Sequence, residues 1–269
     1  MRWQPKCNLK GMRPFLASLL VCAVVSPALA ETPLQEMIGR ANDQVAKFVE
    51  QFSDVKCTEH VVQEKFKADG KIELKEESTY DYLVILTNSG GEVSLDESRL
   101  AVKEQKKDQK KGVSMLVSNG FATLFLVFHP YYSSGFAFTD LGEDKIDGHT
   151  FHKVQFKHLA GMRSPAALAL RGREYPLDLA GVAWIDPETG VIGRIDAGLG
   201  SSMEDIGLKS MRSEVQFQPV PFKNLKDVYW FPAQASVEVE TPRQHWRNTH
   251  NFTDYKKFSV STEEKVAER

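Results

Sequence analysis

The stretch TEHVVQEKFKADGKIELKEESTYDYLVILT, residues 58–87, decides the fold class of this chain. Apolar and polar residues alternate on both sides of Asp69-Gly70, and Asp-Gly between two alternating runs is a strong signal for a hairpin turn. Alternate residues from Tyr80 to Leu86 share one face of the returning strand. Residues 88–91 then form a second turn signal before residues 93–102. The sequence therefore predicts three long antiparallel strands.

A well-marked helix precedes this sheet. Thr32, Pro33 and Gln35 form a capping box with proline at the first helical position. Apolar residues from Leu34 to Phe52 recur at helical spacing, which places them on one stripe while charged residues face away. We expect this amphipathic helix to pack on a large apolar surface.

Residues 1–30 have the features of a secretory signal peptide. Basic residues precede the short apolar stretch Phe15–Val25, and Ala28-Leu29-Ala30 supplies an A-x-A cleavage site. The stretch is too short to span a bilayer comfortably. We therefore predict cleavage after Ala30, a periplasmic or secreted location, and a single domain over residues 31–269.

The composition is that of an ordinary globular protein. With 42% hydrophobic and 26% charged residues, collagen-like, coiled-coil and disordered classes fit poorly. Loss of the leader removes four basic residues and shifts the net charge from −2 to about −6, so a basic nucleic-acid-binding footprint is absent. Cys57 then stays alone, and no internal disulfide can form. We expect a soluble monomer.

Two segments follow the first three strands. Residues 103–112 (KEQKKDQKKG) carry no apolar side chain and are typical of a solvated loop. Residues 121–128 (FATLFLVF) are continuously apolar, and we interpret them as a short buried helix.

The remaining residues alternate mainly between strand and turn signals. Phe136–Leu141 and Val154–Phe156 flank a turned segment, and His158–Gly181 has no sustained period, which favours a long functional or mobile loop. Strand segments continue from Val182 to Phe258. We expect nine to eleven strands and two or three helices: a mainly β, α+β fold whose single curved antiparallel sheet forms an open half-barrel, with the N-terminal helix packed on it.

The chain carries no recognisable catalytic motif. Nucleophile elbows, Walker loops, paired C-x-x-C motifs and H-E-x-x-H are absent from the sequence. His149 and His152, like His245 and His250, have spacings that point to opposite faces of a strand, which disfavours a shared metal ion. We therefore expect no enzyme activity, no catalytic residue, no metal and no cofactor.

The apolar segments are more informative about function. A curved sheet with one helix stripe can enclose more apolar surface than it fills, and such folds hold elongated hydrophobic ligands. Candidates for a groove or its lid are Phe121, Phe125, Phe128, Phe136, Phe138, Leu168, Leu170 and Trp184. The alternative is that each of them packs as ordinary core.

The layout resembles the periplasmic outer-membrane lipoprotein-sorting family, the LolA/LolB-like half-barrels, and the related fold of the RseB regulator. Three features carry the resemblance: the leader followed by the helix of residues 32–52, the segment Leu141–Gly148 before Val154-Gln155-Phe156, and the hairpin WIDPETGVIGR at residues 184–194. The resemblance implies an open barrel closed by helices, which shields acyl chains or lipidated segments in a concave apolar face under a mobile lid. It transfers no individual binding residue.

The first hypothesis is a secreted, non-enzymatic protein that binds a lipid or lipoprotein acyl chain in an apolar groove. A second hypothesis is an interaction or regulatory module on the same fold that docks on another envelope protein. A third and weaker one is a hydrolase without a recognisable motif, which would require acidic and histidine side chains to converge in a polar cleft.

Overall fold

The computed structural model describes residues 32–52, 55–89, 92–102, 124–170, 173–222 and 228–257. All of them belong to the second of the chain's two compact units, Thr32–Arg269. The helical elements are α1 (Pro33–Phe52), η1 (Leu126–Phe128), α3 (Pro130–Ser133) and η2 (Glu204–Ile206). The strands are β1 (Val55–Phe66), β2 (Ile72–Ser89), β3 (Glu92–Ala101), β4 (Phe136–Ile146), β5 (His149–His158), β6 (Ala167–Leu170), β7 (Arg173–Pro176), β8 (Leu179–Ile185), β9 (Ile192–Leu199), β10 (Ser210–Pro221), β11 (Val228–Glu240) and β12 (His245–Lys257).

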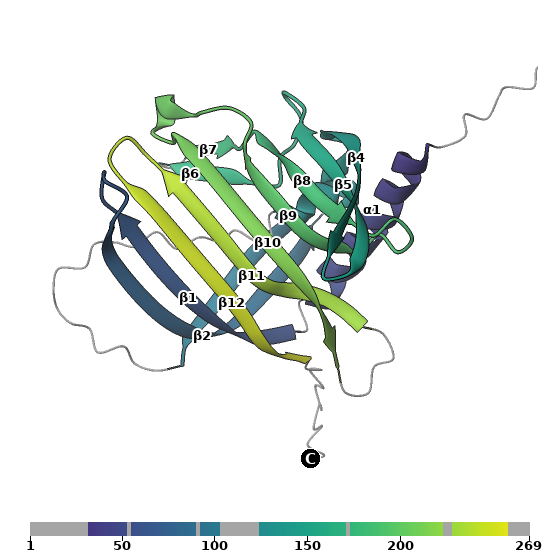
Figure 1. Cartoon of the computed structure of the whole chain (residues 1–269), viewed down its shortest axis with the longest axis horizontal. Coiled ribbons are helices and arrows are strands. Elements are labelled where there is room, and N and C mark those ends of the chain that lie inside the picture. Colours follow the sequence, from purple (N-terminus) through teal and green to yellow (C-terminus); the bar gives the residue numbers. More distant parts are fainter. Residues whose placement is uncertain are drawn as a thin grey trace, which may run out of the picture. The chain divides into compact units, whose positions relative to one another are not determined.

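Ten of these strands form one antiparallel sheet in the order β3-β2-β1-β12-β11-β10-β9-β8-β5-β4. Figure 1 shows one large curved sheet with α1 against one of its faces. Strands β3 and β4 are the two edges of the described sheet, which is therefore not closed into a barrel. The predicted fold class, a mainly β open half-barrel with an N-terminal helix on it, is confirmed.

The N-terminal helix begins as its capping box predicts. The backbone N–H of Thr32 donates to Gln35 Oε1 at 2.9 Å, and the N–H of Gln35 donates to Thr32 Oγ1 at 3.3 Å. Four residues spaced by four positions are buried on one stripe: Met37, Ala41, Val45 and Val49. They join a core cluster with side chains of the sheet and of η1. We call the sheet face in this cluster the inner face.

The hairpin that decided the fold class forms as predicted. Strands β1 and β2 pair antiparallel, with Glu59 opposite Tyr80 and Cys57 opposite Tyr82, and Gly70 in the turn has φ +81°. Strand β2 also pairs with β3, with Tyr82 opposite Arg99. The three predicted strands are therefore β1, β2 and β3. The charged segment 103–112 lies outside the described residues.

The segment expected to be turned, residues 142–152, is mostly strand. Gly142, with φ +89°, forms a bulge between Asp140 and Glu143, and β4 continues beyond it to Ile146. The chain reverses only at Asp147-Gly148, where both residues have positive φ, as a two-residue hairpin requires. A bulge absorbs one extra residue without ending a strand, which the sequence alternation did not reveal.

The predicted long loop over His158–Gly181 is wrong in its middle. Strands β6 and β7 pair there as a two-stranded hairpin, and β8 begins at Leu179. With this hairpin the described residues contain 12 strands, above the predicted nine to eleven. Four-residue strands are too short to show a period in the sequence.

The apolar segment 121–128 is described from Leu124 onward, and Leu124 to Phe128 are all buried. Its end is the 3-10 helix η1 rather than an α-helix. Pro130 holds His129 in extended backbone, with φ −71° and ψ 137°, so the helix stops there and α3 starts anew. The prediction of a short buried helix is therefore confirmed for the described residues, which are α-helical at Leu124 and Phe125 and end in the 3-10 turn.

Gly190 fixes how close α1 lies to the β8–β9 turn. Its φ is +74°, and a Cβ at this position would overlap the backbone of Arg40 and Ala41. We expect Gly190→Ala to lower the free energy of unfolding by about 2–4 kcal/mol, because a strained backbone and an overpacked contact add together.

Urea denaturation measures this difference, with Gly142→Ala as the matched control. Gly142 also has positive φ, +89°, but no described atom lies within 4 Å of its added Cβ. The control should cost about 1 kcal/mol. Equal losses for the two variants would show that the approach of α1 to the turn is not tight.

Candidate functional site

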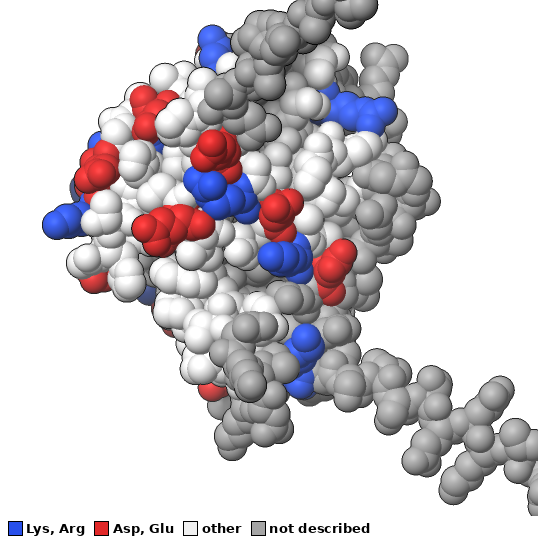
Figure 2. Space-filling view, turned by 90° about the vertical axis from the view of Figure 1, so that its right-hand side faces the viewer, with Lys and Arg blue, Asp and Glu red and all other residues white. Residues whose placement is uncertain are grey.

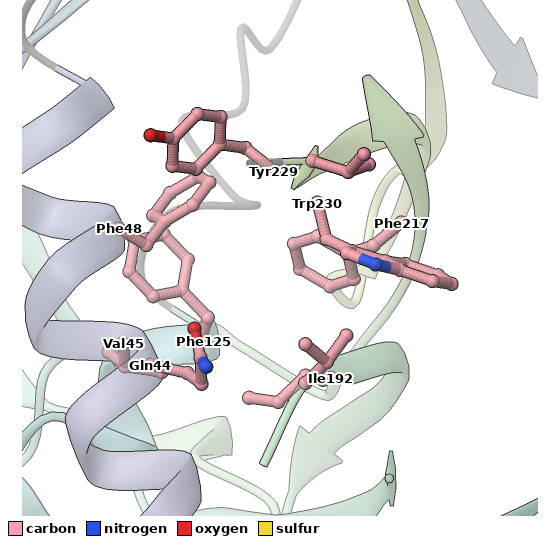
Figure 3. A pocket seen from close by; sticks show the side chains of 10 residues that line it. Gln44, Val45, Phe48, Phe125, Ile192, Phe217, Tyr229 and Trp230 are labelled. Atoms are coloured by element: carbon pink, nitrogen blue, oxygen red, sulfur yellow. The ribbon is translucent and has the colours of Figure 1, made fainter. Parts of the chain in front are cut away.

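An apolar pocket lies between α1 and the strands opposite it. Gln44, Val45 and Phe48 of α1 form one wall, and Phe125 lies beside them. The other wall comes from the β8–β9 connection and from β9, β10 and β11: Val191, Ile192, Phe217, Val228, Tyr229 and Trp230. Figure 3 shows the rings of Phe48 and Phe125 facing those of Phe217 and Trp230 across the opening. Residues far apart in the chain thus build one aromatic pocket.

The wall formed by α1 is held by aromatic contacts. Phe48 meets Phe125 edge to face, with ring centroids 4.7 Å apart, and lies 5.3 Å from Phe231 on β11. Two hydrogen bonds tie the helix to the β8–β9 turn: Arg40 Nε donates to the Pro187 carbonyl at 2.8 Å, and Gln44 Nε2 donates to the Thr189 carbonyl at 3.1 Å. Few polar bonds therefore oppose a small displacement of α1.

The pocket is small in this conformation, with a volume of about 70 Å³. On a comparable measure one water molecule needs about 10–15 Å³. A long apolar ligand therefore fits only if lining side chains or α1 move outward.

The predicted groove residues divide into three groups. Phe125 lines the pocket. Phe128, Phe136 and Phe138 pack behind it as core, with the ring of Phe128 stacked on that of Phe138 at 5.5 Å and edge to face with Phe156 at 6.0 Å. For these three residues the ordinary-core alternative describes the observed position.

Trp184 lies on the sheet face opposite the core. Its neighbours Ala183 and Ile185 are fully buried on the inner face, whereas its own Nε1–H donates to Asp144 Oδ2 at 3.0 Å. The Arg194 guanidinium stacks over its ring at 4.8 Å. Strand alternation directs successive side chains to opposite faces, so Trp184 does not line the pocket.

The remaining predicted residues are placed only by their backbone or not at all. Leu168 and Leu170 lie on β6, whose hairpin with β7 is separate from the large sheet. Phe121 lies outside the described residues. Their role in a groove or lid stays a prediction.

Several pocket residues are not among the sequence candidates. Periodicity assigns Phe48 to the helix stripe, and it marks Phe217, Tyr229 and Trp230 only as strand residues. The run Tyr229-Trp230-Phe231 is an available signal, because strand alternation directs at least one of three consecutive aromatic rings toward the core.

A buried ionic cluster lies on the inner face. The Arg99 guanidinium on β3 donates to both carboxylate oxygens of Glu59 on β1, at 2.6 and 2.9 Å. His250 Nδ1 on β12 lies 2.8 Å from Glu59 Oε1, and since a carboxylate only accepts, the ring nitrogen donates. Glu59 has no exposed surface, and Arg99 also stacks over the Tyr82 ring at 4.9 Å. Three strands are thereby joined through one carboxylate.

The cluster sets the acid–base properties of its neighbours. Burial alone would raise the pKa of Glu59, but the hydrogen bonds from His250 and Arg99 outweigh it and hold that pKa below its usual value. Burial, with the nearby Glu59 charge, raises the pKa of the Cys57 thiol to about 12. The thiol is therefore protonated at neutral pH, and a nucleophilic thiolate is disfavoured there.

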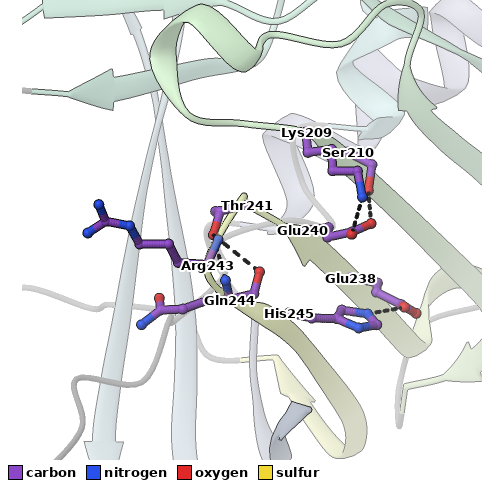
Figure 4. A network of polar contacts seen from close by, with 8 residues as sticks. All are labelled: Lys209, Ser210, Glu238, Glu240, Thr241, Arg243, Gln244 and His245. Atoms are coloured by element: carbon purple, nitrogen blue, oxygen red, sulfur yellow. Dashed lines mark hydrogen bonds and ion pairs between the residues drawn. The ribbon is translucent and has the colours of Figure 1, made fainter. Parts of the chain in front are cut away.

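A second polar network lies at the hairpin tip that joins β11 to β12. Lys209 and Ser210 bind the Glu240 carboxylate, while His245 contacts Glu238 (Figure 4). The pairs are largely solvent-exposed, so they contribute little to stability individually. Lys209 neutralises the charge of Glu240 at this tip.

The described part of the chain holds no group of three His, Cys, Asp or Glu residues placed to bind a metal ion. None of its helices is long and apolar enough to cross a membrane. On the face seen in Figure 2, acidic and basic side chains are interspersed and neither sign gathers into a patch.

Comparison with known proteins yields likenesses among solved structures only. No protein-family model and no curated protein matches the chain. A DUF1329 family protein from Desulfovibrio piger is similar at a TM-score of 0.42 and 12% identity, over 89% of this chain and 96% of that one. A domain from Vibrio parahaemolyticus, described as an outer membrane lipoprotein-sorting protein domain, is similar at a TM-score of 0.40 and 12% identity, over 84% and 94%.

The depressed pKa of Glu59 predicts a loss of stability in acid. A carboxylate whose folded pKa is lowered stabilises the fold above its ordinary pKa of 4.5, and this contribution disappears as the pH falls through the folded value. We expect Glu59→Gln to lower the free energy of unfolding by about 3–5 kcal/mol at pH 7, because Arg99 is left buried without its counter-charge.

Urea unfolding between about pH 7 and pH 3 tests this expectation. The difference in the free energy of unfolding between the wild type and Glu59→Gln should be largest at neutral pH and should shrink in acid. Glu238→Gln is the control, since Glu238 is partly exposed and its loss should cost about 1 kcal/mol or less. A difference that stays constant with pH would contradict the lowered pKa of Glu59 in the folded protein.

Proposed function

We propose that this protein is a non-enzymatic envelope protein that binds the acyl chain of a lipid or lipoprotein in the pocket between α1 and strands β9–β11. The aromatic pocket on the inner face of an unclosed sheet is the observation that carries the proposal. The signal-peptide features of residues 1–30 support a periplasmic location.

The lining chemistry suits a hydrocarbon chain. Apart from Gln44 and the hydroxyl of Tyr229, the residues of both walls present only carbon atoms and the Trp230 indole. A methylene chain makes no hydrogen bonds and gains about 0.8 kcal/mol for each CH₂ removed from water. The affinity of such a pocket therefore increases with the length of the hydrocarbon chain and gains little from polar groups.

The small volume makes movement of α1 part of the binding step. The helix is tied to the β8–β9 turn by the bonds from Arg40 and Gln44, and the side chains of Asn42 and Ser133 link it to α3 at 3.2 Å. It otherwise packs on the sheet and η1 through apolar side chains. When α1 moves outward, the acyl chain fills the space beside these side chains and keeps them out of water. Binding therefore replaces contacts between α1 and the pocket residues with contacts between the acyl chain and the same residues.

Trp230 provides a direct test of the site. We expect a methyl ester of dibrominated stearic acid to quench the fluorescence of the wild-type protein, because bromine quenches indoles in contact with it. Trp230→Phe should remove most of this quenching, whereas Trp184→Phe, on the opposite sheet face, should retain it. Equal quenching in both variants would place the ligand elsewhere.

Loosening α1 should strengthen binding. Arg40→Ala removes the bond to the Pro187 carbonyl without changing a pocket residue, and it lowers the cost of displacing the helix. We expect the dissociation constant for the same ester to fall by about three- to tenfold. Lys47→Ala, at an exposed position of the same helix, is the control and should leave affinity unchanged. Weaker binding by Arg40→Ala would mean that the closed pocket is the binding form.

The small pocket also favours a second candidate, an interaction module that receives an apolar side chain of another envelope protein. Native mass spectrometry with lipid extraction on residues 31–269 separates the two. A stoichiometric acyl adduct supports lipid binding. A mass without adduct, even after addition of phospholipid, counts against it and favours a protein partner.

A further inference from the structure

Polar side chains gather on the inner face beyond the apolar pocket. Six of them are at most 8% exposed: Glu59, Gln63, Ser78, Ser213, Asn248 and His250. With Arg99, which binds Glu59, we call this group the polar band. A buried polar group is costly unless it is hydrogen-bonded, so a set of this size on an otherwise apolar face calls for a physical reason.

The sheet register brings the band together. Gln63 on β1 is opposite Asn248 on β12, Asn248 is opposite Val237 on β11, and Val237 is opposite Ser213 on β10. Along β10, Ser213 is followed on the inner face by Val215 and then by Phe217 of the pocket. One strand thus connects the polar band to the apolar pocket.

Ser213 supplies the observation that points to a ligand. Its side chain is 3% exposed, and its hydroxyl has no hydrogen-bond partner within the described part of the chain. Its register partners Val237 and Ala197 offer only methyl groups. A ligand oxygen or N–H at this position would satisfy the hydroxyl.

The charges of the band restrict what that ligand group can be. Glu59 is the acid of the band and Arg99 its guanidinium, and they neutralise each other in a bidentate pair. His250 donates to the same carboxylate. An incoming carboxylate or phosphate would therefore be buried without a cation to pair with, which is strongly unfavourable. An uncharged ester or amide needs no such partner, so its burial costs much less.

We infer that the polar band receives the uncharged head of the acyl ligand, an ester, amide or hydroxyl group, and that the protein discriminates against ionised head groups. This inference deepens the proposed function and rests on it. Acylglycerols and the acylated ends of lipoproteins share this uncharged ester chemistry.

Three probes with the same chain length separate the head group from the chain: methyl oleate, oleate and 1-octadecene. Their affinities are measured at about pH 8, where oleate is ionised, by displacement of the uncharged dye N-phenyl-1-naphthylamine. We expect methyl oleate to bind at least about tenfold more tightly than oleate and about threefold more tightly than 1-octadecene.

Glu59→Gln should reverse the preference. The substitution leaves the Arg99 guanidinium without its counter-charge, so oleate gains a cation and should bind more tightly than methyl oleate. Glu238→Gln is the matched control, since Glu238 lies between the inward Val237 and Val239 on the outer face of β11 and pairs with His245 and Arg247. The Glu238→Gln variant should prefer methyl oleate over oleate to the same extent as the wild type.

Ser213→Ala tests the band if Glu59→Gln does not fold. It should weaken methyl oleate binding by about three- to tenfold and leave 1-octadecene unchanged, because a single hydrogen bond is lost. Ser236→Ala, on the outer face of β11, should change neither affinity.

The outcomes are distinct. If none of the three probes binds, the proposed function fails and this inference fails with it. If 1-octadecene binds but wild-type protein takes oleate as tightly as methyl oleate, only the inference is overturned. Two further probes, 1-oleoylglycerol and a dipalmitoylglyceryl-cysteine peptide, distinguish a lipid from a lipoprotein as the source of the ligand. The probe that binds more tightly identifies the source. The inference is overturned if neither probe binds more tightly than 1-octadecene.

Discussion

The structure depends on one apolar contact, the packing of the α1 stripe on the inner face of an unclosed sheet. A sheet that is not closed into a barrel leaves its concave side to be covered by other elements. Met37, Ala41, Val45 and Val49 provide that cover together with the buried residues of η1. Because the cover is a separate helix rather than a further strand, the pocket at its margin can change in volume without loss of sheet hydrogen bonds.

The inner face combines two chemically different environments. Near α1 it is aromatic, with Phe48, Phe125 and Phe231 in contact. Further along the same strands it carries the ionic cluster of Glu59, Arg99 and His250. A buried ion pair seldom adds net stability compared with apolar packing. We attribute its presence to the ligand selectivity that we propose for the polar band.

The sequence predicted the architecture well and the site only in part. The capping box and the Asp69-Gly70 turn are local signals, and both form as expected. The sequence marks both Phe125 and Trp184 as groove candidates, but only Phe125 lines the pocket and Trp184 lies on the other face. Periodicity shows which residues share a face, and it does not show which of two faces meets the helix.

By itself the sequence determined the mainly β class, the amphipathic helix and the first three strands, because turn chemistry and side-chain periodicity act over a few residues. Only the tertiary structure decided which side chains meet. Glu59 and His250 are 191 positions apart and touch because β1 pairs with β12, and the pocket exists because α1 lies opposite β10 and β11. Such encounters follow from strand order, which no local pattern in the chain encodes.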